Sequence, residues 1–525
     1  MKRRMNGGQA LVRSLAAQGV AVTFGVPGAG QYEAVDAYFD TDGIRYVSCR
    51  NEQPTTQMAD GYARASNRPA SALVVPGAGL FNACGGISTA LRSSSPIIVI
   101  SGSPEDRLKG ASSSLWLEPI TKWSARATSP AEVAAKVPEA VRAACSGHPR
   151  PVYLEVAAPV LTQEEEVEIA PPATIEPPAG DAAALERAAA MLSDAERPLI
   201  LAGTGVHRSG ASAALAALAE RLPAPVATTT AGKGAISDRS PLALGHALRA
   251  YAPLVEFAQS RDVVLAVGTQ AGPAGLLGVD PDRVIRIDLD AGVLDTGVGA
   301  ADQALAIEAD ARLALETLAA LVRPGRAQDP TAAIAALNGV RFGDTEQLQP
   351  QRSYIEALRA AIPDDGILAY GMNQMGYYSR NYYRAYAPDT YFDPRGNLGS
   401  ALPIAMGAKV ARPDTPVVAC CGDGGVLYHI QELATAVLHG IAVTVVVFND
   451  NAYGNVKRSQ QEDFGGRLVG VDLRNPDFIR LSESFGVRGA RVEDASALRR
   501  ELERAFAGDQ PVLIEVPVGE LKRVY

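Results

Sequence analysis

Two aspartates that each follow an apolar run are the residues of this chain best spaced to act together on one ligand. Asp423 comes directly after the run Val417–Cys421 and stands among glycines, and Asp450 follows the β-branched run Ile441–Phe448. A helical pattern over Val426–His439 separates the two runs. The order strand, helix, strand predicts a βαβ unit, so both carboxylates are expected at the same carboxyl edge of a parallel sheet.

That edge is where open parallel sheets bind their ligands. Gly424 and Gly425 would let a ligand approach the backbone, and the free N–H groups of the following helix favour an anion. Two carboxylates would repel an anion, but Mg2+ prefers oxygen ligands and commonly bridges carboxylates to phosphate oxygens. A lone Gly-Asp-Gly turn can serve only the fold, whereas the second polar cluster at the next strand end favours a clamp for a metal ion and a diphosphate.

The elements that would position these residues fall into three segments of the 525-residue chain. Stretches rich in proline and acidic residues, 162–180 and 322–330, predict two linkers. The first segment alternates helical patterns with strands such as ALVVPG and PIIVISG, the second with PLILAG and VIRIDLD, and the third with AVTVVVF and PVLIEV. We therefore predict an α/β protein with three doubly wound parallel-sheet domains, at residues 1–161, 182–322 and 350–525.

Composition excludes several classes of partner. The net charge is −9, and no dense tract of Lys or Arg is present, which argues against nucleic acid or an acidic membrane as the main partner. No apolar segment approaches the ~20 residues of a membrane span. The five cysteines lack metal-ligand spacing and are typical of core residues in a reducing compartment, so a cytoplasmic protein is expected.

Three stretches of the first segment resemble the pyrimidine-binding domain of thiamine diphosphate-dependent decarboxylases and acetolactate synthases. They are FGVPGAGQYEAVDAYF, RNEQPTTQMADGYARAS and ALVVPGAGLFNACGGISTALRSSSPIIVISG. The GDG of the third segment, followed after a helix and a strand by Asn449-Asp450, resembles the signature of the same enzymes, in which the pair is Asn-Asn. The resemblance covers essentially the whole chain and implies pyrimidine-binding, central and diphosphate-binding domains.

The resemblance assigns a ligand set and a catalytic carboxyl. Mg2+ would be held by Asp423, Asp450 and the backbone carbonyl of Ala452. Glu52 would bind N1′ of the aminopyrimidine, with Asn51 in place of a frequent His. A carboxyl at N1′ favours the cofactor tautomer whose imino group takes the proton from the thiazolium C2.

Further cofactor contacts are implied by the same resemblance. The Gly396 carbonyl would accept the 4′-amine, and Leu398 would hold the bent conformation of the cofactor. Asn373 and Gln374 would contact the diphosphate, beside Gly424 and Gly425.

The reaction expected is the decarboxylation of a 2-oxo acid followed by carboligation to a carbonyl acceptor, as in acetolactate synthases. Ala29 and Val75 stand where related decarboxylases have acids, serines or histidines, so the substrate pocket is expected to be poor in acids and bases. The segments GASSSLWLEPI and Gln461-Glu462-Asp463 depart from the acetolactate synthase pattern. Two alternatives stay open: a non-ligating 2-oxo acid decarboxylase or 2-hydroxyacyl lyase, and a cofactor-binding protein without turnover, against which the intact Glu52 argues.

The central segment carries two features that bear on other ligands. AGTGVHRSG follows a strand but lacks the full dinucleotide fingerprint, so a structural glycine turn is favoured. Arginine-rich FAD contacts are not recognisable, since VGTQAGPAGLLG stands in their place, and FAD is not expected.

In the resembled family Glu52 and Asp423 come from different subunits. That implies a homodimer or homotetramer with active sites between subunits. Among the five histidines, His429 is nearest to the cofactor helix in sequence, and a core or supporting position is favoured for it over catalysis.

Overall fold

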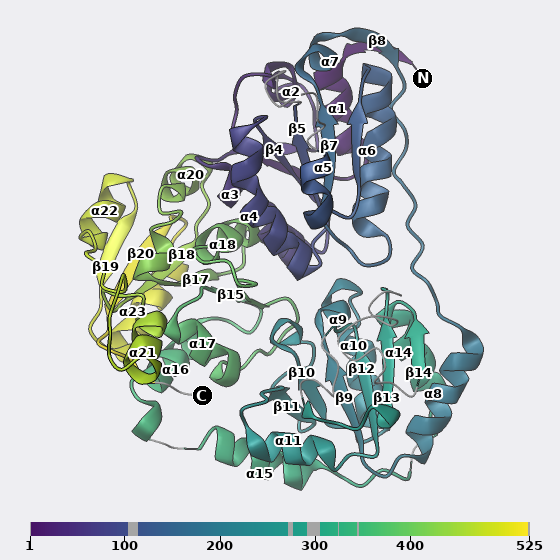
Figure 1. Cartoon of the computed structure of the whole chain (residues 1–525), viewed down its shortest axis with the longest axis vertical. Helices are drawn as coiled ribbons and strands as arrows, with labels where there is room; N and C mark the ends of the chain where they lie inside the picture. The colour runs from purple at the N-terminus through teal and green to yellow at the C-terminus, as the bar shows by residue number, and fades with distance from the viewer. Residues whose placement is uncertain are drawn as a thin grey trace. The chain divides into compact units, whose positions relative to one another are not determined.

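The computed structural model describes residues 2–102, 114–270, 277–290, 305–323, 325–343 and 346–522. The chain divides into two compact units. Unit 1 comprises Met1–Glu176, Ile367–Asn373 and Pro394–Gly519, and unit 2 comprises Pro177–Gly366, Gln374–Asp393 and Glu520–Tyr525. Unit 1 thus combines the first part of the chain with most of its last part, drawn in purple and in green to yellow in Figure 1.

The amino-terminal sheet of unit 1 has six parallel strands in the order β3-β2-β4-β5-β7-β6. Figure 1 shows α1 and α6 on one face of this sheet and α3 and α4 on the other. Side chains of α1, α6 and the sheet share one apolar core. The elements are β2 (Val22–Gly25), β3 (Arg45–Ser48), β4 (Ala70–Val74), β5 (Ile97–Ser101), β6 (Ser124–Ala127), β7 (Val152–Val156), α1 (Gly7–Ala17), α2 (Tyr32–Asp36), α3 (Glu52–Ser66), α4 (Ala78–Ser93), α5 (Ser114–Leu117), α6 (Pro130–Cys145) and α7 (Ala158–Thr162).

The carboxyl-terminal part of unit 1 contributes five more parallel strands, in the order β15-β17-β18-β20-β19. The apolar run before Asp423 forms β17, of which every residue but the last is buried. The elements are β15 (Ile367–Tyr370), β17 (Val417–Gly422), β18 (Thr444–Asn449), β19 (Arg488–Arg491), β20 (Val512–Pro517), α18 (Ala401–Ala411), α19 (Asp423–Val426), α20 (Glu432–His439), α21 (Gly454–Asp463), α22 (Phe478–Ser484) and α23 (Ala495–Phe506).

Within unit 1, α18 packs directly on α3, so the two parts of the chain share one interface. A Cβ atom added at Gly61 would lie 2.0 Å from the carbonyl oxygen of Ile404, and one at Gly407 would lie 1.9 Å from that of Met58. Because only glycine permits this approach, the two helix backbones are in contact.

Unit 2 is built on a parallel sheet in the order β11-β10-β9-β12-β13-β14. One apolar core extends through this sheet and its helices. The elements are β9 (Pro198–Ala202), β10 (Val226–Thr228), β11 (Ala243–His246), β12 (Val263–Val267), β13 (Val284–Asp288), β14 (Leu305–Glu308), β16 (Tyr391–Phe392), α8 (Ala182–Asp194), α9 (Thr204–Arg208), α10 (Ser212–Arg221), α11 (Ala252–Gln259), α14 (Ala311–Leu321), α15 (Thr331–Arg341), α16 (Gln351–Ala361) and α17 (Gln374–Tyr382).

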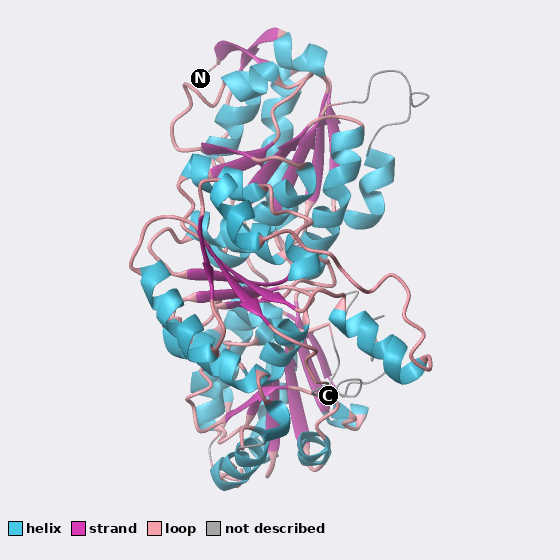
Figure 2. Cartoon of the chain, turned by 90° about the vertical axis from the view of Figure 1, so that its left-hand side faces the viewer, coloured by secondary structure: helices cyan, strands magenta, loops and turns pink. Residues whose placement is uncertain are grey.

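The three sheets, drawn as magenta strands in Figure 2, confirm the prediction of an α/β chain with three doubly wound parallel-sheet domains. Within the described ranges, no helix has both the length and the apolar character needed to cross a membrane.

The interpretation of 162–180 as a linker throughout was wrong at its start. Residues Glu164–Val167 form β8, which pairs antiparallel with β1 (Arg3–Asn6). The pairing joins opposite charges, because Arg4 Nε lies 2.8 Å from Glu164 Oε2. The acidic run is therefore the partner of the basic start of the chain.

The helical pattern over Val426–His439 was also predicted as one helix, and the structure breaks it. Asp423 is the first residue of the short helix α19, turns occupy 427–431, and α20 begins at Glu432. Gly440 ends α20 as a left-handed C-cap with φ of 63°, in agreement with its expected position.

Candidate active site

The two aspartates lie at one edge of the carboxyl-terminal sheet of unit 1. β17 and β18 are parallel and pair Gly422 with Phe448, so Asp423 and Asp450 both follow the carboxyl ends of adjacent strands. Asp423 is buried, with 2% of its surface exposed. The predicted juxtaposition of the two carboxyl groups is therefore present.

The ionisation of Asp450 is disfavoured by its surroundings. Burial, then the neighbouring charge of Asp423 and a hydrogen bond shared with it, raise the pKa of Asp450 to about 7. Like charges this close are stabilised by a shared proton or by a cation between them. The donor set fits a hard divalent cation, because carboxylate oxygens are the ligands that such cations prefer.

The third predicted metal ligand, Ala452, lies next to this pair through its backbone amide, which donates to Asp450 Oδ1 at 3.3 Å. The loop after β18 forms a bridge between Ala452 and Asp472. Its hydrogen bonds use the amide of Tyr453 and the carbonyl of Asn451, at 2.8 Å each, so the carbonyl of Ala452 stays outside the bridge's own hydrogen bonds. In the part of the chain that the structure describes, no group of three or more His, Cys, Asp or Glu side chains could hold a metal ion, so a metal here would need ligands of other kinds beside the two carboxylates, such as a backbone oxygen.

Asn475 joins this cluster and was missed by the sequence analysis. Its Nδ2 donates to Asp423 Oδ2 at 2.6 Å and to the side-chain oxygens of Asn449 and Asn451 at 3.0 and 3.2 Å. Asn449 in turn accepts from the amide of Asn451 at 3.1 Å. The first member of the Asn449-Asp450 pair therefore orders the loop, while the second faces Asp423.

The glycines and amides around Asp423 have specific neighbours. A Cβ at Gly424 would lie 2.7 Å from the ring of Tyr453, and one at Gly425 would lie 3.4 Å from Leu398 Cδ1. At Gly424 the missing side chain thus makes room for protein atoms. Gly425 is in ordinary contact with the residue predicted to bend the cofactor.

Asn373 lies at the same sheet edge, just after β15. Its Nδ2 donates to the carbonyl of Cys420 at 3.1 Å, and its Cβ lies 2.9 Å from where a side chain on Gly422 would begin. Gln374 begins α17, which belongs to unit 2. The contacts of Asn373 thus place its side chain at this edge, and Gln374 follows it as the first residue of α17.

Glu52 begins α3 in the amino-terminal part of unit 1. Asn51 is the N-cap of this helix and accepts from the amide of Gln53 at 2.9 Å, which gives a structural reason for Asn at this position. The Glu52 side chain is buried, with 8% exposed, and Asn82 Nδ2 donates to its Oε2 at 3.1 Å. A Cβ on Gly79 would lie 2.8 Å from Glu52 Oε1, so that glycine provides the space for the carboxyl group.

The loop Gly396–Leu398 connects Glu52 to the aspartate pair. Gly396 has φ of 83°, a conformation that favours glycine. Asn397 accepts from Gln53 Nε2 at 3.3 Å and donates to the carbonyl of Gly85 at 2.8 Å. Since Leu398 is next to Gly425, a chain of contacts runs within unit 1 from the start of α3 to the start of α19.

A second connection runs through α20. Glu432, fully buried, accepts from the amide of Arg50 at 3.0 Å, and the amide of Ser48 donates to His439 Nε2 at 2.9 Å. Burial raises the pKa of Glu432 to about 7, although its hydrogen bonds from Thr435 and the Arg50 amide oppose the rise. The turn that precedes Glu52 is therefore held by the helix that comes after Asp423.

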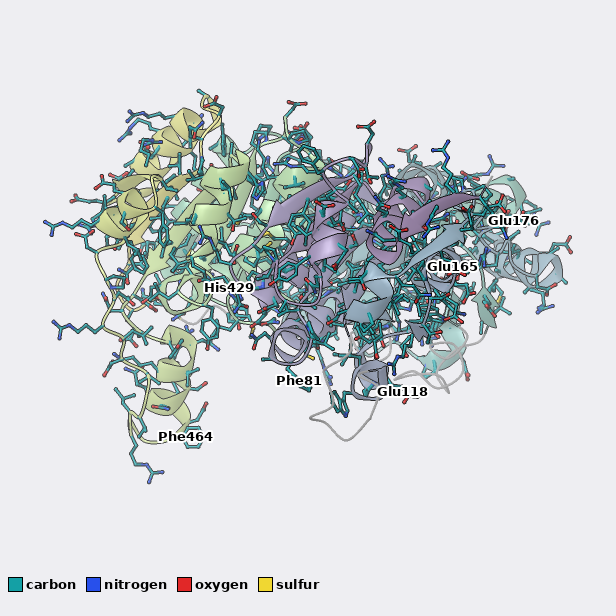
Figure 3. All side chains as sticks on the ribbon, turned by 90° about the horizontal axis from the view of Figure 1, so that it is seen from above. Phe81, Glu118, Glu165, Glu176, His429 and Phe464 are labelled. Atoms are coloured by element: carbon teal, nitrogen blue, oxygen red, sulfur yellow. The ribbon has the colours of Figure 1, made fainter. Side chains whose placement is uncertain are left out.

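His429 is buried at the same junction, where the green and purple ribbons of unit 1 meet in Figure 3. Burial lowers its pKa to about 4, so the ring is neutral near pH 7. Neither ring nitrogen has a hydrogen-bond partner among the described residues. This environment is consistent with a core position for His429.

Apolar atoms surround the carboxyl of Glu52 on one side. The methyl carbons of Val75 fill the space beside Gly28 and Gly79, at 2.4 Å from where either glycine would carry a Cβ. Ala29 is exposed in the same loop. Phe81, next to Asn82, stacks on Trp116 with ring centroids 5.3 Å apart. Residues 110–113 of the GASSSLWLEPI segment lie outside the described residues.

In unit 2, the AGTGVHRSG stretch forms a turn between β9 and the five-residue helix α9. A Cβ at Gly203 would lie 2.3 Å from the carbonyl oxygen of Gly268, and one at Gly205 would lie 2.5 Å from the Gly268 Cα. These glycines allow two loops to pack closely, which supports the interpretation as a structural turn. Residues 271–276 of the VGTQAGPAGLLG segment lie outside the described residues.

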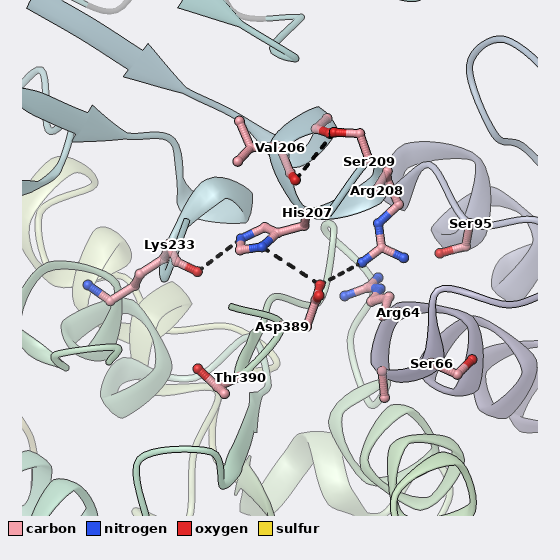
Figure 4. A network of polar contacts seen from close by, with 12 residues as sticks. Arg64, Ser66, Ser95, Val206, His207, Arg208, Ser209, Lys233, Asp389 and Thr390 are labelled. Carbon is pink, nitrogen blue, oxygen red and sulfur yellow. Dashed lines mark hydrogen bonds and ion pairs between the residues drawn. The ribbon is translucent and has the colours of Figure 1, made fainter. Parts of the chain in front are cut away.

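The helix after that turn, α9, carries a buried polar network, drawn in Figure 4. His207 Nε2 lies 3.2 Å from the carbonyl oxygen of Lys233, and Arg208 donates to Asp389 at 3.0 Å. Burial lowers the pKa of His207, while the nearby Asp389 opposes this. The polar groups of α9 are thus engaged by protein atoms of unit 2.

Three family models match the chain in order. The model of the thiamine pyrophosphate enzyme N-terminal TPP binding domain matches residues 5–123, that of the central domain residues 185–319, and that of the C-terminal TPP binding domain residues 370–516. Glu52 lies within the first match, and Asp423 and Asp450 lie within the third.

Proteins of similar sequence cover nearly the whole chain. The probable 2-ketoarginine decarboxylase AruI of Pseudomonas aeruginosa is 34% identical, over 98% of this chain and 94% of that protein. The probable acetolactate synthase large subunit of Methanocaldococcus jannaschii is 30% identical, over 98% and 92%. The sulfoacetaldehyde acetyltransferase of Alcaligenes xylosoxydans is 29% identical, over 98% and 93%.

Proposed function

This chain belongs to the thiamine pyrophosphate enzyme family, and from that premise we propose a thiamine diphosphate- and Mg2+-dependent enzyme that decarboxylates a 2-oxo acid and joins the remaining acyl unit to a carbonyl acceptor. One observation carries the proposal. A buried carboxyl held by an amide, Glu52, and an adjacent carboxyl pair, Asp423 and Asp450, belong to one compact unit and are linked by side-chain contacts.

The residues divide the work of holding the cofactor. Asp423, Asp450 and the carbonyl of Ala452 would hold Mg2+. Asn373, Gln374, Gly424 and Gly425 would contact the diphosphate. When bound, thiamine diphosphate supplies a nucleophilic carbon that adds to the 2-oxo group and stabilises the charge left by the departing CO2.

At the pyrimidine end of the cofactor, the proposed role of the chain is to exchange a proton. Glu52 would share a proton with the pyrimidine N1′, and Asn82 orients its carboxyl group by donating to Oε2 at 3.1 Å. The carbonyl of Gly396 would accept the 4′-amine. Leu398, in contact with Gly425, would maintain the bent cofactor between the two parts of the site.

The apolar surroundings of Glu52 support carboligation. Val75 occupies the space beside Gly28 and Gly79, and Ala29 offers no ionisable group. Without a proton donor there, the acyl unit survives long enough to meet a second carbonyl compound.

A decarboxylase is the second candidate, because a relative 34% identical is named a probable 2-ketoarginine decarboxylase. In that case water or another proton donor completes the reaction, and no ligation product forms. A lyase acting on a 2-hydroxyacyl substrate belongs with this alternative, since it uses the same site and lacks an acceptor.

Assembly as a homodimer or homotetramer, with active sites between subunits, is also proposed. The alternative is a site built within one chain, because α3, which begins with Glu52, packs on α18 of the same chain. Mixing inactive Glu52→Gln and Asp423→Asn chains distinguishes the two. Restored activity requires a site shared between chains. If activity is not restored, Glu52 and Asp423 of the same chain belong to one site.

The reaction itself is tested by incubating the protein, loaded with thiamine diphosphate and Mg2+, with a panel of 2-oxo acids and aldehydes. Mass spectrometry of the products should show ligation products that require both donor and acceptor and are missing with Glu52→Gln. Aldehyde alone would support the decarboxylase, and no conversion of any donor would contradict both. The purified protein should be colourless, and a stoichiometric flavin spectrum would overturn the expectation that FAD is not used.

A further inference from the structure

A cavity of about 600 Å³ lies in unit 2 among residues of α15, α16 and α17. Its volume is within the ~300–1,000 Å³ range of small-molecule sites. None of its lining residues is among the candidate cofactor or metal residues. The cavity therefore has no role in the proposed function.

The lining of this cavity is strongly cationic. Five arginines face two carboxylates, a surplus of three positive charges; the residues are Arg239, Arg341, Arg352, Arg359, Arg384, Glu356 and Asp364. Each carboxylate is exposed and already paired: Asp364 with Arg239, and Glu356 with Arg352 at 2.8 Å. The other three arginines have no ion pair with a carboxylate among the described residues.

Arg341 is the most informative of these three because it is buried, with 6% of its surface exposed. Its Nη1 donates to the carbonyl of Leu244 at 3.1 Å, whereas Nε and Nη2 have no hydrogen-bond partner in the described structure. Burial lowers the pKa of this guanidinium, and the charge of Asp238 opposes the effect only in part. A buried cation with two unused donors is costly unless an acceptor occupies the adjacent space.

Aromatic rings lie against four of the guanidinium groups. Phe342 lies between Arg384 and Arg341, whose guanidinium carbons are 4.5 and 5.6 Å from the ring centroid. Tyr386 lies between Arg239 and Arg359, at 3.7 and 4.8 Å. These cation–π contacts restrict where the guanidinium groups can lie, while guanidinium N–H groups can still donate to an oxyanion.

The hydrogen bonds of Arg359 go to neutral acceptors, and Asp364 is near enough for its pKa to be lowered by this charge. It donates to Pro363 O at 2.7 Å, to Arg384 O at 3.2 Å and to the Tyr383 hydroxyl at 2.8 Å. These neutral acceptors orient the side chain without cancelling its charge. Two more rings, Tyr378 and Tyr382, stack with centroids 4.3 Å apart and add a flat wall to the cavity.

We propose that this cavity binds a small organic anion carrying at least two negative charges on a planar ring, with its phosphate or carboxylate oxygens accepting from Arg341 and Arg384. Arginine forks suit both oxyanions, and the rings of the wall suit a flat ligand. The opposed charges attract at long range, so binding should weaken as salt is raised.

The test is isothermal titration calorimetry on the full chain saturated with thiamine diphosphate and Mg2+, so that the cofactor site is occupied. Benzene-1,3,5-tricarboxylate and phenyl phosphate are the two ringed probes, and inorganic phosphate is the ringless comparison. We expect one saturable site per chain, at least ~10-fold tighter for a ringed probe than for inorganic phosphate. The tighter ringed probe then identifies carboxylate or phosphate as the preferred oxyanion.

Variants distinguish binding in the cavity from non-specific electrostatic binding to the protein surface. Arg384→Gln, an exposed position, should weaken binding of the preferred probe by about 10-fold or more, and Arg341→Lys, which retains the charge but loses the fork, should weaken it as well. Arg187→Gln, an exposed change of equal charge on α8, should bind like wild type. Failure of both ringed probes to saturate the folded wild-type chain, or equal affinity in wild type and Arg384→Gln, would overturn the proposal. Neither result would bear on the proposed cofactor-dependent reaction, which is assigned to other residues.

Discussion

The two ends of the candidate active site hold their carboxyl groups in opposite ways. Glu52 stands alone at the start of α3, and neutral groups serve it: an amide from Asn82 and the space left by Gly79. Asp423 and Asp450 stand together, and burial and the neighbouring Asp423 raise the pKa of Asp450. This contrast supports the proposal that Glu52 exchanges a proton with the cofactor and that the aspartate pair binds a cation.

The largest predicted effect is a loss of cofactor affinity when the aspartate pair, the proposed metal site, is changed. Asp423→Asn removes a carboxylate from the pair but retains a group able to accept from Asn475. Since even the loss of an outer partner of a metal ligand typically costs 10–100-fold, the affinity for thiamine diphosphate at saturating Mg2+ should fall by at least about 100-fold.

Calorimetric titration of the cofactor measures this loss. Asp509→Asn, at an exposed position outside the site, is the matched control and should bind the cofactor normally. Unchanged cofactor affinity in the folded Asp423→Asn protein would show that the pair does not hold the metal.

Glu432, which joins the turn before Glu52 to the helix after Asp423, predicts that the free energy of unfolding depends on pH. Glu432 has a folded pKa of about 7 against an ordinary value of 4.5, so the folded chain binds this proton more tightly than the unfolded chain. Its contribution to the free energy of unfolding is therefore fully present below about pH 4.5 and is lost as the pH rises to about 7, by roughly 3 kcal/mol. Glu432→Gln should flatten that part of the stability profile.

Thermal unfolding of apo wild type and variant across this pH range gives the measurement. The exposed Glu220→Gln serves as the control and should reproduce the wild-type profile. A Glu432→Gln profile with the same slope as wild type would mean that the buried carboxyl titrates with its ordinary pKa.

The contact between the two parts of unit 1 predicts a loss of stability. Gly61→Ala would bring a methyl group to 2.0 Å from the carbonyl oxygen of Ile404, so α3 and α18 must separate. Overpacking of this kind costs about 1–3 kcal/mol. In the α15 helix, Gly339 has no heavy atom within 4 Å of an added Cβ, so Gly339→Ala should be neutral or stabilising by up to about 1 kcal/mol.

Denaturant unfolding of the two alanine variants compares the sites directly. If Gly61→Ala were as stable as Gly339→Ala, α3 and α18 would not be in backbone contact in solution.

The smallest effect is expected at Asp450, where the chain departs from the Asn of the resembled signature. Two unit charges about 4 Å apart at an effective dielectric near 20 repel by about 4 kcal/mol before a metal offsets the repulsion. Asp450→Asn should therefore retain activity, weaken Mg2+ binding and tighten cofactor binding at saturating metal, each by about 10-fold. Titrations of both ligands against both proteins decide it, and a folded variant that binds neither ligand would assign Asp450 to holding the loop 451–454 instead.

Much of this arrangement could be predicted from the sequence. Apolar runs alternating with helical patterns predicted the parallel sheets, and their spacing predicted that Asp423 and Asp450 would share a sheet edge. The break between α19 and α20 could not be predicted, because the apolar positions continue through 427–431 in a helical pattern.

The polar residues that join the parts of the site could also not be predicted from the sequence. Asn475 lies in a loop without periodicity, far along the chain from Asp423, and Asn397 is one polar residue among many. Glu432 is a charged residue in an amphipathic helix, where sequence reasoning expects exposure, but it is fully buried against the turn before Glu52. Such partners are defined by long-range packing, which local patterns do not encode.

Proton exchange at the thiazolium C2 of the bound cofactor, measured by NMR, tests the central claim most directly. With Mg2+ present, Glu52→Gln should slow the exchange by about 10²–10⁴-fold, while cofactor affinity stays close to that of wild type and the exposed Glu186→Gln control exchanges normally. Exchange in Glu52→Gln at the wild-type rate would contradict the account, because the buried carboxyl at the start of α3 would then have no part in activating the cofactor.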